Sequence, residues 1–130
     1  MLSEGILSQI AFDSNGLLPV IVQDLQGRVV MLAYVNRQAL EETIQTGRMH
    51  YYSRSRKRLW LKGEESGNYQ TVKEIYLDCD GDALLCRVEQ KGAACHTGYY
   101  TCFYRKLEEG LPAVGERLFD PDEVYGKKNR

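Results

Sequence analysis

The sequence predicts a single domain of the α+β class, built mainly from antiparallel β-strands with two or three short helices. Its 130 residues suit one domain and are enough to bury a core. Short runs rich in β-branched and aromatic residues recur along the chain, and turn residues separate neighbouring runs. Helix signals are confined to three short stretches with recognisable capping residues.

The clearest helix is predicted over residues 37–46. Asn36 is a good N-cap and Gly47 supplies a C-terminal stop, while Leu40 and Ile44 share one face four residues apart. Two shorter helices complete this part of the prediction: residues 4–10 after a capping Ser3, and a last helix that begins at Asp120 and Pro121.

Seven strands are predicted between the first and the last of these helices. Gln26 and Gly27 suit a tight hairpin turn, and Asp80-Gly81 is a strong hairpin signal, so the strands flanking each pair should be antiparallel neighbours. The chain end, residues 126–130, is expected to fray. The predicted strands cover residues 19–24, 28–35, 49–53, 59–62, 69–78, 83–90 and 99–105.

Charge and hydropathy exclude several classes of protein. The formal net charge of -1 leaves no overall field to attract a partner, so electrostatic recognition must be local. The longest apolar run, residues 29–35, is far shorter than the roughly 18–20 residues of a membrane helix, and the N-terminus lacks a signal-peptide pattern. We therefore expect a cytoplasmic protein with no membrane partner, whose cysteines are thiols or metal ligands rather than disulfides.

An acidic cluster is formed by Asp78, Asp80 and Asp82, at or near a predicted hairpin tip. Carboxylates this close repel one another unless a positive charge lies among them, and hard oxygen ligands suit magnesium or calcium. The spacing is not that of an EF-hand loop, because the later ligands are absent. A solvated acidic turn remains an equal alternative for this cluster taken alone.

Three cysteines, Cys79, Cys95 and Cys102, offer thiolates for a metal, although their spacing alone is also typical of core residues. His96 beside Cys95 strengthens the metal interpretation. Three protein ligands with one open position characterise catalytic zinc, whereas four closed ligands characterise structural zinc. Cys86 lies in an apolar strand and is expected to be a core thiol.

A basic segment with interleaved aromatic residues runs from residue 48 to residue 62 and contains no acidic residue. Arginine forks bind phosphate oxygens, and aromatic faces stack on bases, so the segment favours a phosphorylated nucleotide. A solvated charged loop and an RNA-binding module with a closed zinc site remain alternatives, the latter weakened by the near-neutral chain. The candidate substrate-binding residues are Arg54, Arg56, Trp60, Lys62 and Ser66.

Several long motifs follow one another in the order of a known enzyme family, over roughly residues 12–105. They are GLLPVIVQD at 16–24, VMLAY at 30–34, SRSR at 53–56, LWLKGEESGN at 59–68, DCDGDALL at 78–85, CHTG at 95–98 and CF at 102–103. In these motifs the chain resembles the phosphoribosyl-AMP cyclohydrolases of histidine biosynthesis. The residues after 105 are too few for the pyrophosphohydrolase domain to which this family is sometimes fused.

The resemblance implies an intertwined homodimer that hydrolyses the N1–C6 bond of the adenine ring in 1-(5-phosphoribosyl)-AMP. It implies one zinc per subunit, held by Cys95 and Cys102 together with Cys79 of the partner subunit. It also implies magnesium at Asp78, Asp80 and Asp82.

The two histidines, His96 first and His50 second, are the candidates for moving a proton to N1 during ring opening. Base deaminases attack the same kind of carbon with zinc, but their H-x-E and PCxxC signatures are absent here. Two departures from the family pattern are Ala93, which is expected to affect only a turn, and the pair Tyr99 and Tyr100, where a more polar or basic pair is expected.

Overall fold

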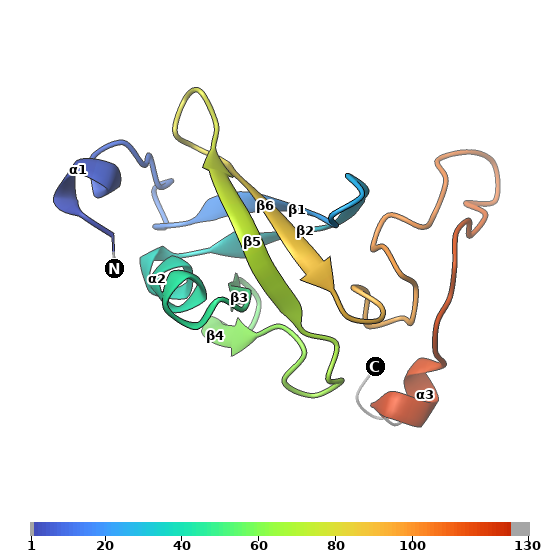
Figure 1. Ribbon diagram of the computed structural model, residues 1–130. Helices are drawn as coiled ribbons and strands as arrows, with labels where there is room; N and C mark the ends of the chain where they lie inside the picture. Colours follow the sequence, from blue (N-terminus) through green and yellow to red (C-terminus); the bar gives the residue numbers. More distant parts are fainter. Residues whose placement is uncertain (1, 126–130) are drawn as a thin grey trace.

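The computed structural model describes residues 2–125, which form three short helices and six strands (Figure 1). The fraying predicted for residues 126–130 falls outside the described residues. Within residues 2–125, no helix combines the length and the apolar character needed to cross a membrane. The elements in chain order are α1 (Glu4–Leu7), β1 (Leu18–Gln23), β2 (Val29–Val35), α2 (Arg37–Thr46), β3 (His50–Ser53), β4 (Arg58–Leu61), β5 (Gln70–Leu77), β6 (Leu84–Gln90) and α3 (Pro121–Val124).

A four-stranded sheet in the order β2-β1-β6-β5 forms the centre of the described chain, and β3 and β4 form a separate two-stranded hairpin. The pairs β1–β2 and β5–β6 are antiparallel, as the turn residues predict, and β3–β4 is antiparallel as well. β1 and β6 are parallel, with Val20 opposite Leu84. The sequence did not predict this contact, because it joins strands that are far apart in the chain and share no turn. The predicted α+β class with mainly antiparallel strands is confirmed.

Helix α2 has the predicted bounds because its two caps are local. The Asn36 side chain accepts a hydrogen bond from the Ala39 N–H at 2.8 Å, and Gly47 ends the helix in the left-handed conformation with φ 74°. The buried face carries Ala39, Leu40 and Thr43, while Ile44 is partly exposed. This face fixes α2 against β3 and the inner face of the sheet.

The core lies on one face of the four-stranded sheet, beneath α2 and the β3–β4 hairpin (Figure 1). Val20, Val22 and Val88 are fully buried on this inner face. Tyr51 of β3 is also fully buried, and its ring lies 5.2 Å from that of Trp60. The β3–β4 hairpin is thereby fixed beside the free edge of β2.

The opposite, outer face of the sheet carries an apolar row that crosses all four strands. The cross-strand register aligns Leu32 with Ile21, Ile21 with Leu85, and Leu85 with Tyr76. Leu32 and Tyr76 at the ends of the row are 47% and 48% exposed, so much of this apolar surface faces solvent in one chain.

Two predicted elements differ in the structure. Residues 99–105 form no strand, only isolated bridges in which Tyr99 faces Arg117 and Arg105 faces Ala113. This segment instead forms a loop that folds back onto β2, where the Cys102 N–H donates to the Val30 carbonyl at 2.7 Å. The first helix is shorter than the predicted 4–10, because the Ala11 N–H donates to the Gly81 carbonyl and draws the chain towards the β5–β6 turn.

Candidate active site

A cleft of about 570 Å³ lies beside the free edge of β2. Its walls come from β2, the β3–β4 hairpin, the turn after β4 and the loop that follows β6. This location gathers residues from most of the segments that the sequence analysis singled out. The predicted functional residues that line the cleft are Arg56, Trp60, Lys62, Ser66, His96 and Cys102.

Cys102 lines this cleft, and the side chain of the buried Cys95 interacts with that of Cys102. The interaction with Cys102, together with the hydrogen bond from Thr97 and the nearby charge of His96, outweighs burial and lowers the pKa of Cys95 to about 5. The same interaction and burial raise the pKa of Cys102. The pair therefore offers one ready thiolate and one thiol in a position to become the second metal ligand.

The backbone of the loop fixes this pair. The Ala94 N–H donates to the Tyr100 carbonyl at 3.0 Å, and the Cys95 N–H donates to the Tyr99 carbonyl at 3.2 Å. Between them Gly98 adopts φ 96°, and a Cβ there would collide with the Phe119 carbonyl oxygen. Only glycine fits, so Gly98 of the CHTG motif is required for the tight turn that returns Cys102 to Cys95.

A buried carboxylate that the sequence analysis missed anchors the same loop. Asp24 is 2% exposed and accepts hydrogen bonds from the Tyr100 hydroxyl at 2.6 Å and from Arg28 Nε at 3.0 Å. Burial alone would raise the pKa of Asp24, but the bonds from Tyr100, Arg28 and the Gln26 backbone lower it overall. The available signal was an Asp three residues before the hairpin glycine, Gly27, which is usually interpreted as a turn residue and no more.

Lys62 at the end of β4 is unusual for a predicted phosphate ligand, because it is only 6% exposed. Burial lowers the pKa of its ammonium group, while the charges of Cys102 and Cys95 act in the opposite direction. The Lys62 side chain thus lies in the inner part of the cleft, close to the thiol pair.

Other members of the basic segment occupy different places. Arg58 joins Arg56 in lining the cleft. Arg54 lies outside the lining, with its guanidinium carbon 3.9 Å from the centre of the Tyr34 ring. His50 is also outside the lining, and its Nδ1 lies 2.9 Å from the Arg48 carbonyl oxygen. Of the two histidines, only His96 reaches the cleft.

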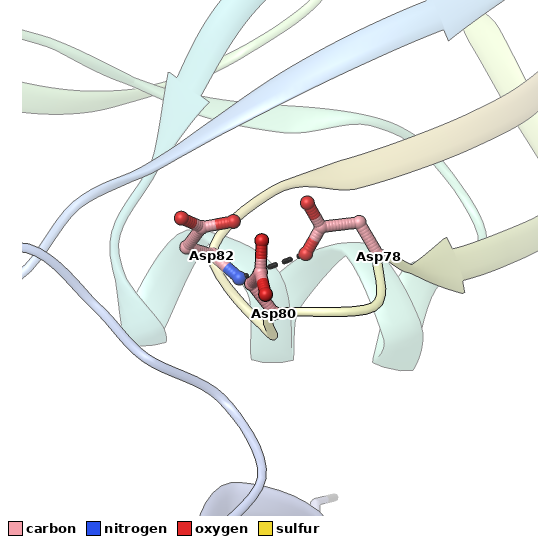
Figure 2. A group of neighbouring side chains, drawn as sticks. All are labelled: Asp78, Asp80 and Asp82. Carbon is pink, nitrogen blue, oxygen red and sulfur yellow. Dashed lines mark hydrogen bonds between the residues drawn. The ribbon is translucent and has the colours of Figure 1, made fainter.

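The acidic cluster forms a separate group at the turn between β5 and β6. Ligand oxygens of Asp78, Asp80 and Asp82 lie within 4.8 Å of one another, and all three residues are exposed (Figure 2). The Asp82 N–H donates to Asp78 Oδ1 at 2.9 Å. Contact with Asp78 raises the pKa of Asp82. For Asp78, the backbone and side-chain bonds from residues 81–83 outweigh burial and lower the pKa. Such a set of oxygens can hold a hard cation.

Cys79 lies in this acidic turn, whereas the Cys95–Cys102 loop follows the other end of β6 (Figure 1). Seven residues of β-strand, Leu84–Gln90, separate the two ends, which corresponds to about 20 Å. Among residues 2–125, the three aspartates are the one set of three or more potential ligands whose atoms come this close. Within one chain, therefore, Cys79 is exposed and does not join the other two cysteines.

Comparison with known proteins identifies the family. A family model described as phosphoribosyl-AMP cyclohydrolase matches residues 31–104, which is more than half of the chain. A phosphoribosyl-AMP cyclohydrolase of Chlorobium limicola is 52% identical over 98% of this chain and 96% of its own length. Proteins of the same name from Methanothrix thermoacetophila and Methanoregula boonei are 57% and 58% identical, over 92% and 91% of this chain and 98% and 95% of theirs. The chain belongs to the phosphoribosyl-AMP cyclohydrolase family.

Proposed function

We propose that this protein is a zinc-dependent hydrolase that opens the adenine ring of 1-(5-phosphoribosyl)-AMP at the N1–C6 bond, in histidine biosynthesis. The relatives described above carry the name of this activity. The observation that carries the proposal is the composition of the cleft, whose lining includes Cys102, His96, Trp60 and two arginines, while Cys95 interacts with Cys102.

The cleft matches the chemistry of the substrate. Arg56 and Arg58 offer guanidinium forks for a phosphate, and Trp60 offers an aromatic face for the purine. Ser66 adds a hydroxyl to the same wall. These groups bind and orient the nucleotide so that its six-membered ring lies towards the thiol pair.

The residues present fit a zinc ion. Cys95 has the low pKa of a metal-binding thiolate, Cys102 touches it, and soft sulfur ligands suit zinc. When bound, zinc would supply hydroxide at neutral pH by lowering the pKa of a coordinated water. Two ligands from one chain leave the set incomplete, and the exposed Cys79 of the partner subunit is the third.

Hydrolysis adds the oxygen of water to C6, breaks the C6–N1 bond and delivers a proton to N1. His96 is next to Cys95 in sequence and lines the cleft, so it is the residue that moves this proton. His50, the second candidate, lies outside the cleft lining, which favours His96. Lys62 places a basic group near the thiols in the inner part of the cleft.

A homodimer is part of the same proposal, because the zinc ligand set that the family resemblance implies takes Cys79 from a second chain. The apolar row of Leu32, Ile21, Leu85 and Tyr76 offers a partly exposed surface for such an association. Burying apolar surface of this kind is what stabilises obligate dimers. Magnesium is the proposed occupant of the acidic cluster, where three carboxylates would otherwise repel one another. Reduced cysteines fit a cytoplasmic location.

The experiment is direct. Purified protein is incubated with phosphoribosyl-AMP, and ring opening is followed by ultraviolet absorbance. We expect turnover that a strong chelator abolishes and added zinc restores. Protein with verified zinc content that leaves the substrate intact would contradict the activity, and full turnover in protein verified to be free of metal would contradict the role of zinc.

A further inference from the structure

A second cavity, of about 430 Å³, lies next to the cleft, and His96 lines both. Its walls come mainly from the irregular chain between β6 and α3. The family model ends at residue 104, so part of this cavity lies beyond the matched region. Its other lining residues are Thr97, Tyr99, Tyr104, Arg117 and Pro121.

Arg117 is held in a fixed orientation at this cavity. Its Nε donates to the Thr97 carbonyl at 3.1 Å, and its guanidinium lies 5.8 Å from the centre of the Tyr99 ring. The Tyr99 ring in turn stacks on Tyr104, with centroids 3.9 Å apart and planes parallel. The backbone is fixed too, because Leu118 N–H donates to the Gly98 carbonyl at 2.6 Å. A guanidinium that is already oriented loses little entropy when it binds an anion.

The free donors of Arg117 suit an anion. Nε is used for Thr97, and within residues 2–125 the two terminal nitrogens make no hydrogen bond or ion pair. Within the part of the chain that the structure describes, no acidic side chain lines the cavity, in contrast to the larger cleft, where Glu64 and Glu65 form part of the wall. The hydroxyl groups of Tyr99 and Tyr104 offer further donors at the same wall.

The shape of the proposed substrate requires two anion sites. Phosphoribosyl-AMP carries one phosphoribosyl group on N9 and another on N1, so its two phosphates project from opposite sides of the purine. If His96 acts at N1, the phosphates must extend to either side of His96. Arg56 and Arg58 are available in the cleft, and Arg117 is available in the second cavity.

We propose that the second cavity binds one of the two 5′-phosphates of the substrate through Arg117, while the cleft binds the other. This inference rests on the proposed function and extends it, because it divides substrate recognition between two cavities joined at His96. The ligand is a phosphate monoester on a ribose, and the binding group is a guanidinium fork.

The test compares Arg117→Gln with Arg105→Gln, an exposed arginine of the same irregular segment that lines neither cavity. Arg117→Gln is expected to lower kcat/KM for phosphoribosyl-AMP by about 10- to 100-fold, mainly through KM, since a charge-assisted hydrogen bond is lost. Arg105→Gln should match the wild type. Circular dichroism checks that both variants fold.

Two competitors identify the phosphate involved: one analogue lacks the phosphate on the N1 ribose, and the other lacks the phosphate on the N9 ribose. Their inhibition constants are measured with wild type, Arg117→Gln and Arg58→Gln. The analogue that lacks the phosphate bound by Arg117 should bind wild type and Arg117→Gln equally. The analogue that keeps this phosphate should bind Arg117→Gln more weakly than wild type. Arg58→Gln should show the reverse pattern. Unchanged kinetics in Arg117→Gln, or an equal loss for both analogues, would overturn the subsite. A wild-type protein that does not open the ring would instead refute the proposed function itself.

Discussion

The two ends of β6 carry two candidate metal sites of opposite character. At the β5–β6 turn, Asp78, Asp80 and Asp82 are exposed and offer hard oxygen ligands. After the other end, Cys95 is buried, Cys102 is half-buried, and both offer soft sulfur. The pKa of Cys95 falls to about 5 because its interactions with Cys102 and Thr97 outweigh burial. The comparison shows that a buried site depends more completely on its few protein neighbours than an exposed one. Substitutions should therefore cause severe losses of metal and activity at the cysteines and milder losses at the aspartates.

The largest effect is expected at the buried end. Cys95→Ser removes the thiolate with the lowered pKa, so zinc content and activity should fall together, with activity down at least about 100-fold. The matched control is Cys86→Ser, because Cys86 is buried in β6 away from both candidate sites and should cost stability without loss of zinc. The zinc content per subunit is measured for both variants, and circular dichroism checks that both fold. Loss of zinc from Cys86→Ser with zinc retained in Cys95→Ser would reverse the assignment.

A mixing experiment tests whether the two ends meet across subunits. Cys79→Ala and Cys95→Ala should each be inactive alone, but their heterodimer contains one site with all three cysteines. If subunits exchange freely, half of the dimers are heterodimers with one intact site in two, so activity should recover to about one quarter of wild type. Activity recovered on mixing is measured after denaturation and joint refolding of the pair. No recovery, despite heterodimers detected by mass spectrometry, would show that Cys79 does not complete the partner subunit's site.

The exposed end should respond more weakly. Asp80→Asn removes one carboxylate from a set of three, so magnesium affinity should fall about 10-fold and activity by no more than that, with zinc content unchanged. Glu89→Gln, an exposed carboxylate near the other end of β6, is the control and should alter neither. Magnesium titration by calorimetry is the measurement. A loss of zinc in Asp80→Asn would mean that the two ends are not independent.

The smallest effect concerns the anchor of the cysteine loop. Tyr100→Phe removes the hydroxyl that donates to Asp24, and should lower the free energy of unfolding by about 1–2 kcal/mol at pH 7. The pKa of Asp24 is lowered in the folded protein. The carboxylate therefore stabilises the fold at pH values above its ordinary pKa, and this contribution is lost as the pH falls through the lowered pKa of the folded state. Denaturant unfolding at pH 7 and near pH 3 should therefore show the difference between wild type and variant shrinking in acid. A difference that stays constant would show that the bond does not depend on the carboxylate charge.

Local signals in the sequence were sufficient for much of the fold. The bounds of α2 are correct because Asn36 and Gly47 act within a few residues of the helix, and the β5–β6 turn is correct because Asp80-Gly81 needs no distant partner. The strand predicted at residues 99–105 is wrong because its backbone donors are used by distant groups, such as the Val30 carbonyl. Intrinsic preference cannot reveal a partner that only the tertiary fold supplies.

The candidate site shows the same division. Motifs identified Cys102, His96 and Lys62, which the structure brings to one cleft. They assigned no role to Asp24, which ends the first motif, and did not include Arg117, because each acquires its environment only when the loop after β6 folds back. Arg54 shows the converse: it belongs to the basic segment, yet its guanidinium lies over the Tyr34 ring instead of lining the cleft.

The parallel contact between β1 and β6 has a consequence for how the chain folds while it is being synthesised on the ribosome. β1 and β2 can form a hairpin as soon as they emerge, but the second edge of β1 finds its partner only when residues 84–87 have been made. Until then that edge keeps unpaired backbone groups, which invite pairing with other nascent chains. The cysteine loop is translated later still and closes on β2 through Cys102 and Val30. The order of synthesis therefore delays formation of the reactive thiol pair until the sheet that holds it is complete. It also makes the interval before β6 emerges the period in which the chain is most exposed to misassembly.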